Sequence, residues 1–345
     1  MKVGTFRRNK SGCYWYRVKR TQDILKKSGF KTVTMNLNED IDDDIDIYSI
    51  YGSQPFSMRK VLNSFKEDKK KIVYDVDDAL TLMEESSPFY HDIMASVPSF
   101  IENLQYADEI TTTTAEMERY LRTKTDKKIT VIPNTYDPTE WTFERPKREG
   151  IRIGFAGSPT HLGDLLLVLP AIRNLQKKYV FTFILFGFSK YGTYREWYAA
   201  ERFAAQGQRL ADLLEFDKLM SEINFEYVPF VDYELYPTVL TNIALDIGLC
   251  PLRDTPFNRC RSACKAMEYT LSGAVSLASD VEPYKSEVDS ILVSDGNWED
   301  AIEALIKYPD VRKTFLEASK TWIEENRNMN SQIETLKKVY GIQVR

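Results

Sequence analysis

The chain has 345 residues, which is long for one hydrophobic core and favours two domains of ordinary size. Its 43% hydrophobic and 12% aromatic residues can bury such cores, so general disorder is excluded. The formal net charge of −5 provides no global basic field, which argues against non-specific nucleic-acid binding.

The cysteines and histidines give little support for a metal site. No paired C-x-x-C set occurs, and neither His91 nor His161 is near Cys260 and Cys264 in the sequence. Unpaired cysteines are typical of a reducing cytoplasm, which is the compartment we expect. The N-terminal segment lacks the apolar core of a signal peptide, and no apolar run is long enough to cross a bilayer. A peripheral membrane contact or a homodimer stays open.

The first half of the chain alternates short apolar runs with amphipathic stretches. The apolar runs predict strands at Met1–Phe6, Lys31–Leu37, Ile45–Tyr51, Lys71–Val76, Glu109–Thr114 and Ile129–Pro133. The amphipathic stretches predict helices at Tyr16–Ser28, Ser57–Phe65, Pro98–Ala107 and Ala115–Arg122.

A second series of strands follows a polar stretch with two prolines, Asp137–Gly150, which we interpret as a linker. The strands are predicted at Ile151–Ala156, Val180–Phe186, Phe225–Val231, Ile243–Cys250, Ala274–Ala278 and Ile291–Val293, with helices between them. A last helical pattern covers Ala318–Tyr340.

Strands that alternate with helices imply right-handed crossovers and parallel sheets. The predicted fold class is therefore α/β, with two Rossmann-like doubly wound domains over residues 1–145 and 150–324. A C-terminal helix at about residues 325–345 is expected to pack back on the first domain. Because ligands of open parallel sheets bind outside the carboxyl ends of the strands, the function should lie in the cleft between the domains.

The strongest candidate site is the stretch Phe257–Tyr284, interpreted as a loop, a helix and a buried strand. If the helix opens near Arg261, steps of four and three residues align Arg261, Lys265 and Glu268 on one face. Two cations beside a helix N-terminus suit a diphosphate, and the carboxylate suits ribose hydroxyls. The alternative is an exposed face with an ordinary ion pair.

A second candidate is the turn that follows the strand Ile151–Ala156. Gly157 and Ser158 would let backbone and hydroxyl approach a phosphate closely, and His161 lies near the start of the next helix. The alternative is an ordinary small-residue turn in which His161 caps or packs.

A third candidate is KIVYDVDDAL, a strand that delivers Asp75, Asp77 and Asp78 to its carboxyl end. Three interpretations are open: a phosphatase whose nucleophile is the first aspartate, a metal-binding D-x-D, and an acidic cluster that orients sugar hydroxyls or an acceptor. We favour the third and assign Asp77 and Asp78 to catalysis. Near the N-terminus, Gly12 is expected to allow close approach of a ligand and Arg17 to reach an anion.

These residues together resemble a GT-B glycosyltransferase, and more narrowly glycosyltransferase family 4. The matching blocks are YDVDDAL, GFAGSPTHLGD and LDIGLCPLRDTPFNRCRSACKAMEYTLSGAVSLASDVEPY, with support from VIPNTYD. The resemblance implies transfer of a sugar from a nucleotide diphosphate donor, with retention of configuration and with no cofactor or metal.

The resemblance also implies roles for single residues. Glu268 would hold the ribose, Arg261 and Lys265 the diphosphate, and the backbone near Phe230 and Val231 the base. A uridine diphosphate sugar is the expected donor partner, and a glycan, a lipid, a protein or a nucleic acid stays open as the acceptor.

The chain departs from the family pattern at one glutamate, which should lie eight positions before Glu268. Cys260 occupies that position. We expect it to line the donor site together with its neighbours Asn258, Arg259 and Ser262, with Asn258, Arg259 or backbone amides taking over the contact to the donor sugar. Because of this departure, the main alternative to a transferase is an inactive nucleotide-sugar-binding protein. An epimerase on the same fold and a phosphatase using Asp75 are lesser alternatives.

Overall fold

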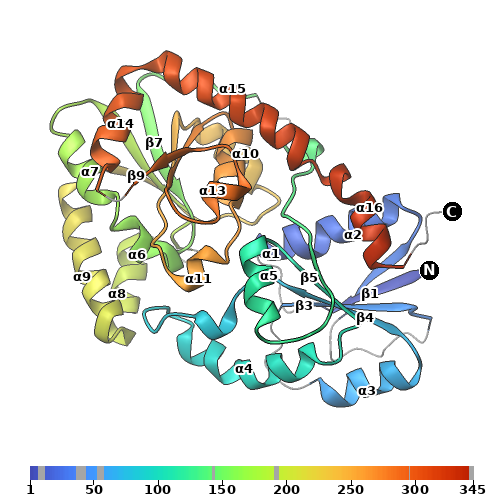
Figure 1. The fold of residues 1–345 in the computed structure, drawn as a ribbon. Helices are drawn as coiled ribbons and strands as arrows, with labels where there is room; N and C mark the ends of the chain where they lie inside the picture. The colour runs from blue at the N-terminus through green and yellow to red at the C-terminus, as the bar shows by residue number, and fades with distance from the viewer. Residues whose placement is uncertain are drawn as a thin grey trace.

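The computed structural model describes residues 1–6, 12–35, 44–52, 58–141, 144–189, 194–294 and 296–341. Within them the chain forms two six-stranded parallel sheets, as predicted. The sheets lie in two lobes joined by the connection between residues 131 and 151 (Figure 1).

The first sheet has the strand order β2-β1-β3-β4-β5-β6. Its strands are β1 (Lys2–Phe6), β2 (Lys31–Met35), β3 (Ile47–Tyr51), β4 (Lys71–Val76), β5 (Glu109–Thr112) and β6 (Ile129–Val131). The helices of this half are α1 (Gly12–Tyr14), α2 (Arg20–Lys27), α3 (Arg59–Glu67), α4 (Tyr90–Leu104) and α5 (Ala115–Arg122). Strand β3 is buried along its whole length, as its apolar sequence requires when helices cover both faces of a sheet.

The second sheet has the order β12-β11-β10-β7-β8-β9. Its strands are β7 (Ile151–Ala156), β8 (Phe181–Phe186), β9 (Phe225–Val228), β10 (Ile247–Cys250), β11 (Val275–Ser279) and β12 (Ile291–Val293). Its helices are α6 (Leu162–Leu165), α7 (Leu169–Leu175), α8 (Tyr194–Ala204), α9 (Gly207–Glu222), α10 (Tyr236–Ile243), α11 (Pro256–Arg259), α12 (Cys264–Leu271), α13 (Tyr284–Glu287) and α14 (Trp298–Lys307).

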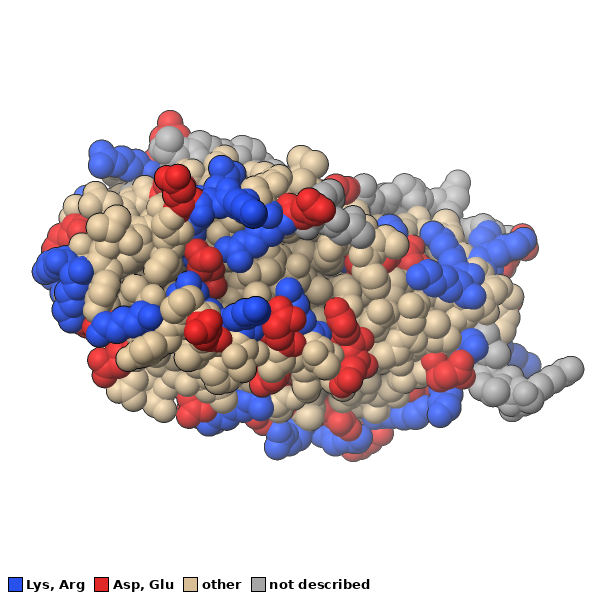
Figure 2. Space-filling model, turned by 90° about the horizontal axis from the view of Figure 1, so that it is seen from above, with Lys and Arg blue, Asp and Glu red and all other residues tan. Residues whose placement is uncertain are grey.

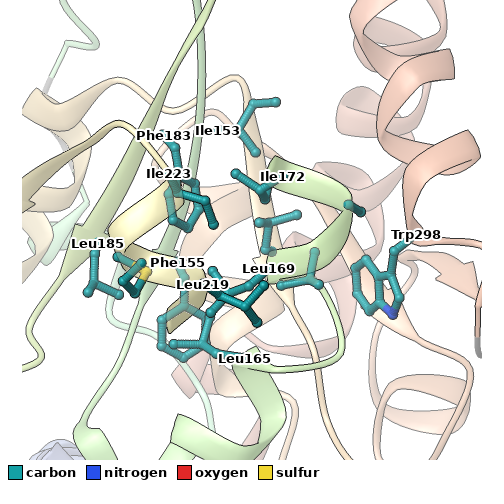
Figure 3. Packing of buried hydrophobic residues seen from close by; sticks show 14 of the residues in the cluster. Ile153, Phe155, Leu165, Leu169, Ile172, Phe183, Leu185, Leu219, Ile223 and Trp298 are labelled. Atoms are coloured by element: carbon teal, nitrogen blue, oxygen red, sulfur yellow. The ribbon is translucent and has the colours of Figure 1, made fainter. Parts of the chain in front are cut away.

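The core of the second half packs helices against the inner strands of this sheet. Ile153 and Phe155 of β7 meet Leu165 and Leu169 of the following helices (Figure 3). Trp298 at the start of α14 closes the same cluster. This packing fixes the carboxyl end of β7, from which the turn at Gly157 departs.

Three predicted helices differ from the structure. The predicted helix Tyr16–Ser28 is in fact α1, a π-helical turn at Trp15–Lys19 and α2. The helix predicted at Pro98–Ala107 begins at Tyr90 and contains Pro98; the eight residues before the proline and the six after it support the turn that proline weakens. The helix expected to open near Arg261 is divided: α11 ends at Arg259 and α12 begins at Cys264.

The C-terminal segment returns to the first half of the chain. Helix α15 (Pro309–Asn326) runs along the second lobe, and α16 (Ile333–Val339) lies beside α2 (Figure 1). Lys71 at the start of β4 donates a hydrogen bond to the carbonyl of Val339, and the hydroxyls of Ser49 and Tyr340 are 2.9 Å apart. The predicted single helix is thus interrupted between α15 and α16, and α16 packs against α2 of the first half.

Charges of both signs are interspersed over the face shown in Figure 2, without a broad patch of one sign. No helix in the described ranges has both the length and the apolar character needed to cross a membrane.

Candidate functional site

A central cavity of about 320 Å³ is lined by residues from both halves of the chain. It brings together ten of the predicted site residues: Gly12, Asp77, Asp78, Gly157, Ser158, His161, Arg261, Ser262, Lys265 and Glu268. Two other cavities border it. A side cavity of about 510 Å³ shares Asp78, Ser158 and Arg261 with it, and an aromatic pocket of about 360 Å³ shares Gly12 and Glu268.

Lys265 projects from the first turn of α12 toward the end of β7. Its Nζ donates a hydrogen bond to the carbonyl of Ala156 at 2.6 Å and lies 4.6 Å from the centre of the Phe155 ring. Burial lowers the pKa of Lys265. A Cβ atom at Gly157 would lie 2.8 Å from this amine, so glycine is what allows the lysine to reach the turn.

Arg261 lies between α11 and α12 and is held by His161. Its Nη1 is 2.9 Å from Nε2 of His161, while Nδ1 of His161 is 2.8 Å from Asp164. Since guanidinium only donates, Nε2 must accept, and Nδ1 therefore carries the proton toward Asp164. Burial, followed by the charges of Arg261 and Lys265, lowers the pKa of His161 to about 4. The imidazole is neutral at pH 7 and can position the cation.

Glu268 lies on α12 one turn after Lys265 and is 9% exposed. Tyr16 of the first half donates to one carboxylate oxygen at 2.5 Å, and Tyr236 of α10 donates to the other at 3.0 Å. Burial raises the pKa of Glu268, and the two hydroxyls and Lys265 oppose that rise. The carboxylate is thus fixed between the central cavity and the aromatic pocket.

Asp77 and Asp78 face the cations from the end of β4. The hydroxyl of Tyr51 donates to Asp77 at 3.0 Å. Burial, then the charges of Asp78 and Asp75, raise the pKa of Asp77 to about 7. Burial also raises the pKa of Asp78, against the opposing charge of Arg261. One side of the cavity is therefore acidic and the other basic.

Arg17 does not point into the central cavity, where a ligand anion would bind, because its guanidinium is held by groups of the protein. Its guanidinium forms three hydrogen bonds with Asp75, at 2.8, 3.0 and 3.3 Å, and another with the carbonyl of Ile132. Its remaining contact is to the side chain of Asn134 at 3.1 Å. Both members of this ion pair are buried, so Arg17 ties the π-helical turn to β4.

Cys260 occupies the position where the family pattern has a glutamate, and the side chains of Cys260, Arg259 and Asn258 point in three directions. Cys260 is buried in the cluster that contains Phe257, Met117 and Leu121, against the first sheet's helices. Arg259 is exposed and forms an ion pair with Asp254. Asn258 donates to the carbonyl of Arg253 at 3.0 Å and borders the side cavity. Cys260 therefore supports the contact between the two halves, away from the central cavity.

Phe230 and Val231 line the aromatic pocket together with Trp15, Tyr16, Asp232, Tyr233, Glu234 and Tyr236. The rings of Trp15 and Tyr233 are stacked with centroids 5.0 Å apart, and Tyr233 is stacked on Tyr236 at 6.0 Å. A planar base fits such a pocket, because stacking on aromatic faces is favourable for any base.

Several residues that line these cavities or bind their lining residues are not among the predicted site residues. Tyr16 and Tyr236 bind Glu268, Asn134 donates to Ser262 at 2.9 Å, and Thr160 borders both the central and the side cavity. No local signal separates Tyr16 from its packing neighbours Tyr14 and Trp15. Its direction depends on the π-helical turn, which a sequence pattern does not reveal.

Among the residues that the structure describes, no group of three or more His, Cys, Asp or Glu side chains is arranged to hold a metal ion.

No family model matches the sequence, and no curated protein is detectably similar to it. Solved structures match in fold. HepE from Anabaena, in complex with UDP and glucose, aligns over 99% of this chain and 100% of its own, with a TM-score of 0.63 and 13% identity. A glycosyltransferase from Rickettsia africae aligns over 99% of both chains, with a TM-score of 0.64 and 12% identity.

An alpha-glucosyltransferase in complex with UDP and DNA aligns over 98% of this chain and 99% of its own, with a TM-score of 0.65 and 12% identity. These likenesses cover almost the whole chain and include both sheets. The chain therefore has the GT-B fold, two Rossmann-like domains that face each other across a cleft.

Proposed function

We propose that this chain is a retaining glycosyltransferase that moves a sugar from a nucleotide diphosphate donor, expected to carry uridine, to an acceptor without a metal ion. One observation carries the proposal: Arg261, Lys265 and Glu268 line the same cavity between two Rossmann-like domains. The solved structures with the same fold include proteins in complex with UDP, which supports the choice of donor.

In this reaction the bond between the sugar C1 and the diphosphate oxygen breaks, and a bond from C1 to an acceptor hydroxyl oxygen forms. The hydroxyl proton leaves with the diphosphate. Negative charge grows on the departing group, so fixed cations stabilise the transition state more than the ground state. Arg261 and Lys265 are held in advance, by His161 and by the carbonyl of Ala156, for this task.

We assign the nucleoside end of the donor mainly to the second domain, which also carries Arg261 and Lys265. Glu268 would accept hydrogen bonds from ribose hydroxyls, and the aromatic pocket beside Phe230 and Val231 would hold the base. On the acidic side, Asp77 and Asp78 are assigned to orienting hydroxyl groups, because carboxylates are strong acceptors for them.

The test is release of the nucleoside diphosphate, UDP or GDP, from a panel of uridine and guanosine diphosphate sugars, with and without EDTA. We expect turnover that EDTA does not change and a product whose anomeric configuration, read by NMR, matches the donor. Arg261→Ala should lower turnover by roughly 10²–10³-fold, the loss typical for removal of one transition-state donor. Arg119→Ala, an exposed arginine of α5, is the control. A panel without turnover, and unchanged nucleotide affinity in Arg261→Ala, would refute the proposal.

A further inference from the structure

The side cavity lies next to the central cavity on the side of Asp78 and Arg261. Those two residues, with Cys13, Ser158 and Thr160, line both cavities. A molecule in the side cavity would therefore lie next to a donor in the central cavity, beside Asp78 and Arg261. At about 510 Å³ the side cavity has room for one or two sugar rings, within the usual size of ligand pockets.

The wall of the side cavity carries more negative than positive charge. Among the described residues that line it, five have carboxylates and three have guanidiniums: Asp78, Glu84, Asp92, Asp164 and Asp212 against Arg209, Arg253 and Arg261.

Two of the three guanidiniums are paired with carboxylates, and the third, Arg261, is the one that we assign to the donor diphosphate. Arg253 forms a bidentate pair with Asp212, at 2.9 and 3.2 Å. Arg209 is paired with Glu201 of α8, and Arg261 donates to His161.

The carboxylate of Glu84 is the clearest acceptor in this cavity. In the described part of the chain, it has no side-chain hydrogen bond or ion pair, and burial followed by the charge of Asp164 raises its pKa. Such a group is stabilised by a donor that enters the cavity and is destabilised by a further negative charge.

Apolar side chains form the rest of the wall. Met83, Phe89 and Ile93 of the first domain line it opposite Leu162 and Phe257. Phe89 is 53% exposed, so its ring is accessible to a ligand. Apolar surface beside a few acceptors suits a sugar, which has a C–H face and a rim of hydroxyls.

We infer that the side cavity is the acceptor site and that it selects a neutral or amine-bearing sugar over a phosphorylated or carboxylated one. The assignment of the cavity to an acceptor rests on the proposed function. The selectivity for uncharged or amine-bearing sugars rests on the charges of the cavity wall alone. Hydroxyls and amines donate to Glu84 and Asp92, which line the cavity. An anionic group beside them faces these carboxylates, while Arg209 and Arg253 are paired with Glu201 and Asp212 and Arg261 is assigned to the donor diphosphate.

The experiment is titration calorimetry of the full chain with methyl α-glucoside, glucosamine and glucose 6-phosphate, with and without saturating UDP. We expect the first two to bind and the phosphate to bind about tenfold more weakly or worse, from like-charge repulsion inside the cavity. Equal or tighter binding of glucose 6-phosphate, or no binding of the neutral sugars, overturns the inference. Absence of UDP binding is a failure of the proposed function alone, since the sugars are also titrated without UDP.

A charge reversal at Glu84 should increase the affinity for an anionic sugar, which a misfolded variant could not do. In Glu84→Lys, glucose 6-phosphate should bind about tenfold more tightly than in the wild type, since a repulsion becomes an attraction. Glu85→Lys is the matched control, because Glu85 is exposed on the same turn and does not line the cavity. Equal effects of the two substitutions, or no effect of either, would contradict the assignment.

Discussion

His161 gives the sharpest test of the arrangement around Arg261. The imidazole is neutral in the folded protein because its pKa falls from 6.5 to about 4. The unfolded chain therefore binds a proton more readily than the folded chain as the pH falls. His161 thus makes the protein less stable in acid: the loss begins near pH 6.5 and is complete near pH 4.

The size of the effect follows from the two pKa values. Between pH 7 and pH 5, this single group lowers the free energy of unfolding by about 2 kcal/mol. The side chain is only 15% exposed, so screening by solvent reduces the figure little. Asp77 acts in the opposite direction: its pKa is raised to about 7, so its stabilising contribution is present in acid and is lost as the pH rises through 7.

A variant comparison isolates the histidine from Asp77 and the other carboxylates. Gln in place of His161 can still accept from Arg261 but does not titrate. Urea unfolding at pH 7 and pH 5 should therefore show the wild type losing about 2 kcal/mol more than His161→Gln. His91→Gln, at an exposed position of α4, should behave like the wild type. Parallel pH profiles for the wild type and His161→Gln would refute a neutral, buried His161.

Three further substitutions test other parts of the site. Gly157→Ala places a methyl group 2.8 Å from both the amine of Lys265 and the buried ring of Phe155, so UDP affinity by calorimetry and the unfolding free energy should both fall; unchanged affinity would show that the lysine is not needed at this turn. Asp75→Asn breaks the buried pair with Arg17 and should cost about 3–5 kcal/mol in urea unfolding, whereas a small loss would mean that water reaches the pair. Cys260→Glu buries a carboxylate in an apolar cluster and should destabilise the fold by several kcal/mol. If the Cys260→Glu protein is stable and turns over faster, residue 260 contacts the donor and the buried position assigned to it is wrong.

Much of the fold could be predicted from the sequence because parallel strands are buried on both faces. The runs Lys71–Val76, Ile151–Ala156 and Ile291–Val293 coincide with β4, β7 and β12. The predicted helix Tyr16–Ser28 is less accurate, since the structure divides it into a π-helical turn and α2. The π-helical turn at its start depends on tertiary contacts, above all the pair between Arg17 and Asp75, which local patterning does not encode.

The residues that line the cavity can be derived from the sequence where they follow a strand, and less readily where their position depends on a loop. Gly157 and Asp78 lie directly beyond β7 and β4, so their place at the cleft follows from topology. Arg261 reaches the cavity by a different route from the expected helix face, because the chain breaks the helix between Arg259 and Cys264. The type of side chain at Arg17 suggested an anion site, but its partner Asp75 lies 58 positions away.

The division of the helix explains why Cys260 and Arg261, although adjacent, serve different surfaces. In the short segment between α11 and α12, Cys260 packs against the first domain while Arg261 turns into the central cavity. Tyr16 adds a second link between the halves, since it donates to Glu268 across the cleft. The basic side of the cavity and the contact between the domains are thus built from the same segment. A change that separates the domains would withdraw Tyr16 from Glu268 and would also disturb Arg261, so loss of the interface and loss of the site should occur together.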